Sequence, residues 1–209
     1  MSDDTRGSAD GLETDAEPTA DRWLADGSPL SAELPADVGV ALGRVLGEEP
    51  VETLGDWLAE VRRRVGGGAI AVEDLCHADE ETGHWGELDG ETYYFQCFYD
   101  AVILSALAET PVDVRTESPD GTVIEARAAG TADLTVTPES AVFSFGVAES
   151  VEPPADEGPS HADVYAAVCP YVRAFPDADA YARWAATVPA VTVAMPFAGA
   201  TDVAEKLVE

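Results

Sequence analysis

The sequence predicts an α+β fold, with an N-terminal helical, winged-helix-like part followed by a mixed, largely antiparallel sheet with packed helices. Three observations lead to this prediction. Apolar residues recur at helical spacing between residues 35 and 65, an Asp-Gly pair at 89–90 separates two alternating segments, and alternating segments continue through residues 112–147. At 209 residues, the chain is long enough for one large domain or two small ones.

We expect three parts along the chain. Residues 1–20 are small, acidic and turn-forming, which is typical of a disordered leader. Residues 21–96 should form the helical, winged-helix-like part, and residues 97–209 should form the α+β core. After the helix that follows residue 97, the apolar period changes from that of helices to that of strands.

The second part should contain helices and a hairpin. Residues 21–24 fit the start of a short helix, and Pro35 suits the first turn of the next one. The clearest helix covers residues 54–65 and ends at three glycines, and its Trp57 is expected in the core. An Asp-Gly pair between the two halves of residues 84–96 predicts a β-hairpin.

The third part should combine strands and helices. Clusters of Pro, Gly, Asp and Ser separate its apolar segments. We expect strands at 112–115, 122–127, 134–136 and 142–147, an exposed connection at 149–162, a strand at 164–170, a helix at 177–186, a strand at 191–195 and a helix at 201–208.

The charge balance argues against some classes of function. With 41 acidic and 11 basic residues, the chain carries a net charge of −30. Such a surface repels phosphates, so we expect no binding to nucleic acid or to anionic membranes. The acids are spread along the whole chain, which fits a cytoplasmic protein of a halophile, because molar salt screens the self-repulsion. No apolar run resembles a signal peptide or a membrane span.

Cys97 is the first candidate for chemistry. The aromatic segment 93–99 leads into an apolar helix, so Cys97 should lie near a helix N-terminus with Asp100 on the same face. There the helix dipole favours a thiolate, and the carboxylate can take or supply a proton. The alternative is a small buried Cys and an Asp that complements the dipole. An odd, low cysteine count, Cys76, Cys97 and Cys169, indicates free thiols.

Two other clusters make weaker candidates. Cys76, His77 and His84 could hold zinc if a fourth ligand came from elsewhere, but no C-x-x-C pair is present and loop residues are the favoured interpretation. Arg residues at 62–64 could mark a nucleic-acid recognition helix. The favoured interpretation is that these Arg residues complement the dipole at the C-terminal end of that helix, because the net charge opposes nucleic-acid binding.

The combined pattern resembles the organomercurial (alkylmercury) lyase family. The resemblance rests on the Cys-Phe-Tyr-Asp motif at 97–100, which opens an apolar helix, and on Cys169, which is followed by an aromatic-rich segment, a Pro-initiated helix and Trp184. It covers about residues 35–209. Where many family members have a further, structural cysteine, this chain has Ser118.

The resemblance implies a mercury-resistance enzyme that breaks the carbon–mercury bond. Two cysteines and an aspartate are catalytic in the family, and motif by motif they fall on Cys97, Cys169 and Asp100. The two thiolates would hold the mercury of substrate and product, and Asp100 would protonate the carbon. The resemblance also implies an organomercurial substrate, no cofactor, and cellular thiols or a mercuric reductase as acceptor of the Hg²⁺ product.

Two other functions stay open from the sequence. The same thiols could belong to a trafficking or sensing protein for Cu(I), Zn²⁺ or Hg²⁺, in which Asp100 is structural. A winged-helix regulator that uses residues 62–64 is disfavoured by the net charge. The lyase interpretation requires the Cys97 and Cys169 thiols to lie close together, with the Asp100 carboxyl facing both.

Overall fold

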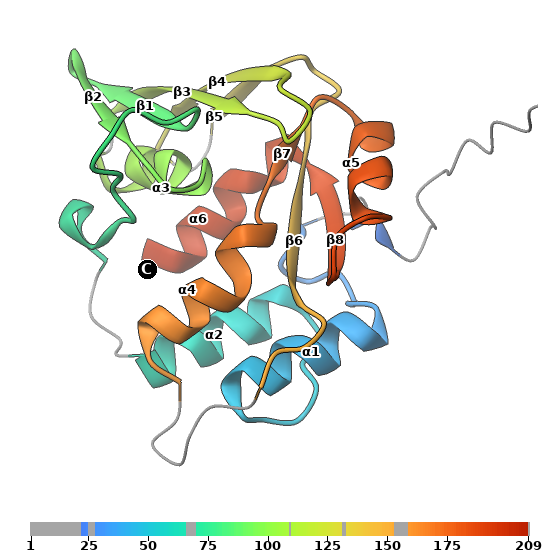
Figure 1. Cartoon of the computed structure of the whole chain (residues 1–209). Coiled ribbons are helices and arrows are strands. Elements are labelled where there is room, and N and C mark those ends of the chain that lie inside the picture. The colour runs from blue at the N-terminus through green and yellow to red at the C-terminus, as the bar shows by residue number, and fades with distance from the viewer. Residues whose placement is uncertain are drawn as a thin grey trace, which may run out of the picture.

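The fold combines helices with two antiparallel sheets (Figure 1). The prediction of an α+β fold is therefore confirmed. The structure is a computed structural model that describes residues 22–24, 28–65, 70–108, 110–130, 133–152 and 159–208. The expected leader at 1–20 lies outside these ranges. No helix within them is long and apolar enough to cross a membrane.

The larger sheet has five strands: β1 (Trp85–Leu88), β2 (Glu91–Tyr94), β3 (Pro111–Glu117), β4 (Val123–Ala129) and β5 (Asp133–Thr137). Their order is β2-β1-β3-β4-β5, and every pairing is antiparallel. The predicted hairpin is present, since Asp89 and Gly90 at its turn have φ of 53° and 84°, as a two-residue turn requires. Alternate residues of β3 and β4 are buried, and helix α3 (Tyr99–Ala108) packs on that face.

The smaller sheet has three strands: β6 (Val142–Ala148), β7 (Ala174–Phe175) and β8 (Ala190–Pro196). The middle strand is β6, and six of its seven residues are buried, so both of its faces are covered. The alternation of residues 112–147 did not reveal that the strands divide between two sheets. The prediction that a helix starts in residues 21–24 is also wrong, because Trp23 forms a parallel bridge to Ala194 of β8.

The predicted N-terminal helices are present as α1 (Ala36–Leu46) and α2 (Leu54–Val65). Pro35 caps the start of α1, and Gly47 closes it in a left-handed conformation with φ of 69°. The hairpin that follows them pairs with β3 through β1, so it is part of the larger sheet. The winged-helix outline and the division at residue 97 stay predictions.

The segment 164–170 is helical, so the prediction of a strand there is wrong. Helix α4 (His161–Val168) begins at Ser160, whose Oγ accepts the Asp163 N–H while the Asp163 carboxylate accepts the Ser160 N–H. This capping box starts a helix directly after the Pro-rich connection. The segment is short and apolar, and periodicity alone does not separate a buried strand from a buried helix at that length.

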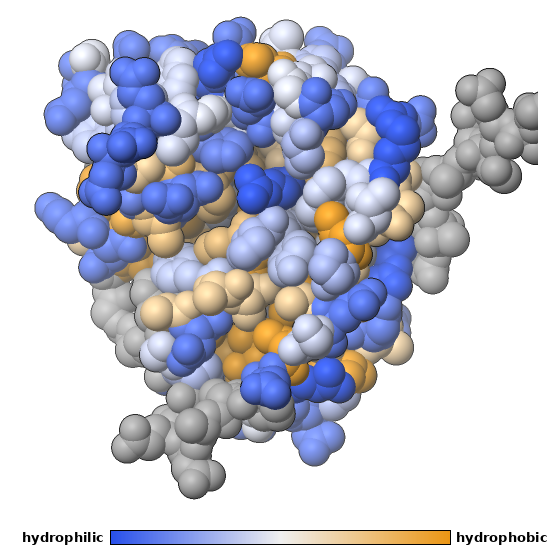
Figure 2. All heavy atoms as spheres, viewed as in Figure 1, coloured by the Kyte–Doolittle hydropathy of each residue, from blue (hydrophilic) through white to orange (hydrophobic). Residues whose placement is uncertain are grey.

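Two predicted helices are present as α5 (Ala178–Ala185) and α6 (Ala200–Val208). The 3₁₀ turns η3 (Cys169–Tyr171) and η4 (Phe197–Gly199) were not predicted. Helix α6 packs against both α3 and α2. Figure 2 shows a largely hydrophilic surface at the rim, with apolar residues gathered near the middle and lower part, where α4 and α2 lie in Figure 1.

Candidate active site

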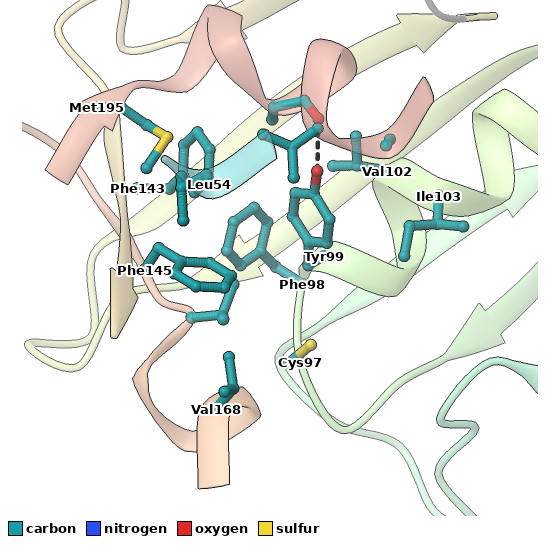
Figure 3. Packing of buried hydrophobic residues seen from close by; sticks show 14 of the residues in the cluster. Leu54, Cys97, Phe98, Tyr99, Val102, Ile103, Phe143, Phe145, Val168 and Met195 are labelled. Atoms are coloured by element: carbon teal, nitrogen blue, oxygen red, sulfur yellow. Dashed lines mark hydrogen bonds between the residues drawn. The ribbon is translucent and has the colours of Figure 1, made fainter. Parts of the chain in front are cut away.

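Cys97 lies in the turn between β2 and α3. The Gln96 N–H donates to the Cys76 carbonyl at 2.9 Å, which ties this turn to the segment before the larger sheet. Helix α3 begins at Tyr99, so the prediction that Cys97 lies near a helix N-terminus is confirmed. The Cys97 side chain is only 5% exposed, among the apolar residues that Figure 3 draws around it.

Asp100 faces Cys97 from the first turn of α3. The Cys97 thiol donates to Asp100 Oδ2 at 3.4 Å, a length suited to a sulfur donor, and the Cys76 N–H donates to the same carboxyl. Burial raises the pKa of the Asp100 carboxyl, while these hydrogen bonds and the nearby His77 lower it by less. A buried carboxyl with a raised pKa holds a proton better than an exposed one, which suits a general acid.

Cys169 reaches the same place from the far end of the chain. It is half-buried at the start of η3, and its thiol is a hydrogen-bonding partner of the Cys97 thiol. Ser144 of β6 holds this turn, because its Oγ donates to the Tyr171 carbonyl at 2.7 Å and accepts the Arg173 N–H at 3.2 Å. The structure thus brings together the three side chains singled out in the sequence.

The start of helix α3 favours the Cys97 thiolate, as expected, but other contacts outweigh this effect. The hydrogen bond with Cys169, burial and the charge of Asp100 raise the pKa of the Cys97 thiol well above its usual value. A hydrogen bond from the Tyr99 N–H at the start of α3 lowers this pKa, but by less. The free thiol is therefore protonated, and its proton must leave when a metal binds.

An apolar cavity of about 320 Å³ adjoins the three side chains. Tyr99 lies on its wall with its hydroxyl bonded to the Ala200 carbonyl at 2.7 Å, as the dashed line in Figure 3 marks. The cavity can hold an organic group beside the thiols. Besides Cys97, Asp100, Cys169 and Tyr99, its wall includes Trp57, Leu58, Val61, Ile103, Phe143, Phe145, Val164, Tyr165, Val168 and Val203.

The sequence did not place two neighbours, Cys76 and Tyr165, at this site. Burial, Asp100 and Cys169 raise the pKa of the Cys76 thiol to about 12. Burial, together with the charges of Asp100 and the three cysteines, raises the pKa of the Tyr165 hydroxyl. The low cysteine count was a signal for Cys76. Tyr165 lies in the segment 164–170, which was predicted to be a strand, and no pattern there indicated a functional residue.

The zinc alternative at Cys76, His77 and His84 is not supported. The His77 Nε2 lies 2.8 Å from the Val72 carbonyl oxygen, and the His84 Nδ1 lies 2.7 Å from Thr116 Oγ1, so each ring is engaged elsewhere. Across the described ranges, no group of three or more His, Cys, Asp or Glu side chains is already arranged to hold a metal ion.

Two thiols and a buried carboxyl lie beside an apolar cavity, an arrangement that can bind a soft metal with an organic group. Residues 78–209 match the family model described as alkylmercury lyase, MerB. The chain therefore belongs to the alkylmercury lyase family, as its sequence predicted.

The comparisons with individual proteins add little to this assignment. Among solved structures, the chain is similar to one described as "Crystal structure of the mercury-bound form of MerB2". The identity is 17%, over 74% of this chain and 73% of that chain, with a TM-score of 0.47. No curated protein matches this chain.

Proposed function

We propose that this chain cleaves the carbon–mercury bond of organomercurials by protonolysis, giving a hydrocarbon and Hg²⁺. The observation that carries the proposal is the hydrogen bond from the Cys97 thiol to Asp100, next to Cys169 and at the wall of an apolar cavity. Membership in the alkylmercury lyase family supports the same reaction.

Cys97 captures the mercury. Organic mercury is a soft cation, and thiolates are its natural ligands. As the sulfur binds, its proton passes to Asp100, which already accepts a hydrogen bond from it. The organic group lies in the cavity, whose apolar wall keeps water from the reacting atoms.

Cys169 adds a second sulfur to the mercury, and its proton leaves with the ligand that the mercurial carried in. The second thiolate raises the electron density on the carbon. Asp100 then donates its proton to that carbon, and the electron pair of the carbon–mercury bond forms the new carbon–hydrogen bond. The products are a hydrocarbon, Hg²⁺ held by Cys97 and Cys169, and an ionised Asp100. Burial favours the proton-loaded carboxyl because it raises the pKa.

Outside acceptors complete the cycle. Hg²⁺ bound by two thiolates leaves by exchange with other thiols, so cellular thiols or a mercuric reductase would receive it. A cytoplasmic location, where thiols stay reduced, fits this requirement.

The test measures hydrocarbon and Hg²⁺ release from a simple organomercurial, in molar KCl with excess thiol. Cys97→Ser, Cys169→Ser and Asp100→Asn are compared with wild type, and Ser140→Ala serves as an exposed control. We expect all three site variants to lose turnover. Asp100→Asn should still bind mercury, with cleavage slowed by about 10²- to 10⁴-fold, the usual contribution of a general acid.

A second outcome would point to a different function. If wild type binds mercury stoichiometrically through Cys97 and Cys169 without releasing hydrocarbon, the chain is a thiol-based metal carrier and the lyase proposal fails. In that case Asp100→Asn should behave like wild type, because a carrier has no use for a proton donor.

A further inference from the structure

The third cysteine, Cys76, lies at the same site although the proposed reaction does not use it. Its N–H donates to the Asp100 carboxyl, and its carbonyl accepts the Gln96 N–H at 2.9 Å, next to Cys97. The Cys76 thiol is within electrostatic range of both Asp100 and Cys169. Cys76 and Cys97 thus both contact the Asp100 carboxyl, and Cys169 contacts Cys97.

The three thiols differ in their surroundings. Cys97 is buried, whereas Cys76 and Cys169 are each partly open to solvent. Cys97 and Cys169 line the apolar cavity, but Cys76 does not. Cys76 therefore lies beside the other two thiols and outside the space that the organic group would fill.

We propose that Cys76 is an exit thiol, which takes Hg²⁺ from the Cys97–Cys169 pair after bond cleavage and presents it to outside thiols. This inference rests on the proposed function, since the Hg²⁺ that moves is the product of that reaction. Transfer to Cys76 would give the buried Hg²⁺ a path toward solvent that does not pass through the apolar cavity.

The transfer is a ligand exchange without any change of oxidation state. After protonolysis, the ionised Asp100 takes the Cys76 proton, and the Cys76 thiolate forms a new bond to mercury. The bond from mercury to Cys97 breaks with its electron pair left on that sulfur, and Asp100 returns the proton to Cys97. Mercury then lies between Cys76 and Cys169, and the Cys97 thiol again donates to Asp100, ready for the next substrate.

A passing exchange agrees better with the described residues than a permanent three-thiol centre. No set of three potential ligands within those residues is already arranged around a metal position. Mercury would therefore be held by two sulfurs at a time and handed from the buried member of the pair to a more exposed one.

The first test compares Cys76→Ser with wild type, using phenylmercury as the substrate and glutathione as the outside thiol. We expect first-turnover release of benzene to keep its rate, while transfer of Hg²⁺ to glutathione slows. A tethered thiol acts at an effective concentration in the millimolar range, so with outside thiol at about 0.1 mM the slowing should be about tenfold. Raising the glutathione concentration should restore the rate. Ser140→Ala is the matched control.

A second measurement uses the wild-type chain and does not depend on a variant that folds. After one turnover without an acceptor thiol, exposed thiols are alkylated and the modified cysteines are mapped by mass spectrometry. Cys76 is partly open to solvent, so it should be alkylated in the mercury-free chain. We expect mercury to protect it after the turnover.

Alkylation of Cys76 after the turnover, at the same rate as in the mercury-free chain, would overturn the inference. Equal Hg²⁺ transfer by Cys76→Ser and wild type at every glutathione concentration would overturn it as well. Both results leave the lyase intact. Absence of benzene from wild type would instead refute the proposed function, so the two failures are distinguishable.

Discussion

Replacing Ser144 by Ala should uncouple mercury capture from bond cleavage. Ser144 is fully buried on β6, and its hydroxyl holds the C-terminal side of the turn that carries Cys169. The Oγ donates to the Tyr171 carbonyl at 2.7 Å and accepts the Arg173 N–H at 3.2 Å. Alanine leaves both backbone groups without this partner. Cys97 lies in a different segment and keeps its hydrogen bond to Asp100.

The magnitude follows from two buried hydrogen bonds. Each contributes about 0.5–1.5 kcal/mol, so the free energy of unfolding should fall by about 2 kcal/mol. In a chain of this length, about 2 kcal/mol corresponds to a fall of about 4–8 °C in the unfolding midpoint. The effect on catalysis should be larger, because a reacting group displaced by about 1 Å can cost about 100-fold in rate.

The assay pairs denaturant unfolding in molar KCl with single-turnover release of hydrocarbon and with a mercury-binding titration. Ser140→Ala is the matched control, because Ser140 also donates to a backbone carbonyl, that of Pro176 at 2.9 Å, but in an exposed position. We expect Ser144→Ala to bind the organomercurial through Cys97 and to cleave it slowly. A Ser144→Ala variant as stable and as fast as the control would refute the assignment of Ser144 to Cys169.

Two further perturbations test the surroundings of the site. Ser160→Ala removes the capping box of α4, the helix that leads to Cys169, and should lower the free energy of unfolding by about 1 kcal/mol in denaturant titrations; an unchanged midpoint would contradict that role. Burial lowers the pKa of His84 below its ordinary 6.5, so the unfolded chain binds the proton more readily than the folded one. The contribution of His84 to stability is therefore complete above pH 6.5 and is lost as the pH falls below it. His84→Gln should flatten this slope when unfolding is followed between about pH 7 and pH 5, and an unchanged slope would assign the acid sensitivity to other groups.

Elements with a strong local signal were predictable from the sequence. The Asp89-Gly90 turn and the Pro35 start of α1 need only neighbouring residues, and both are present. The segment 164–170 was mispredicted because its apolar residues fit either period, while the deciding signal was the pair Ser160 and Asp163 just upstream. The split into two sheets depends on long-range pairing, which alternation does not encode.

The site shows the same division between local and tertiary information. The spacing of Cys97 and Asp100 at a helix start predicted their contact, which the structure contains. Cys169 was placed only through the resemblance to a family, because no local pattern links it to Cys97. Cys76 joins the site through backbone pairing with Gln96, which is a tertiary contact. The raised pKa of Cys97 depends on Cys169 and on burial, which outweigh the opposite effect of the helix start and are tertiary features.

The burial of Asp100 reconciles a net charge of −30 with a reaction that needs a neutral acid. At about 1 M salt, the screening length is about 3 Å, so surface carboxylates have little influence on a side chain that is 2% exposed. The proton on Asp100 is then governed by its immediate neighbours, which are Cys97, the Cys76 N–H, His77 and the apolar cavity. A strongly acidic surface and the proposed proton donor can therefore occur in one chain, because burial separates the charges that determine each.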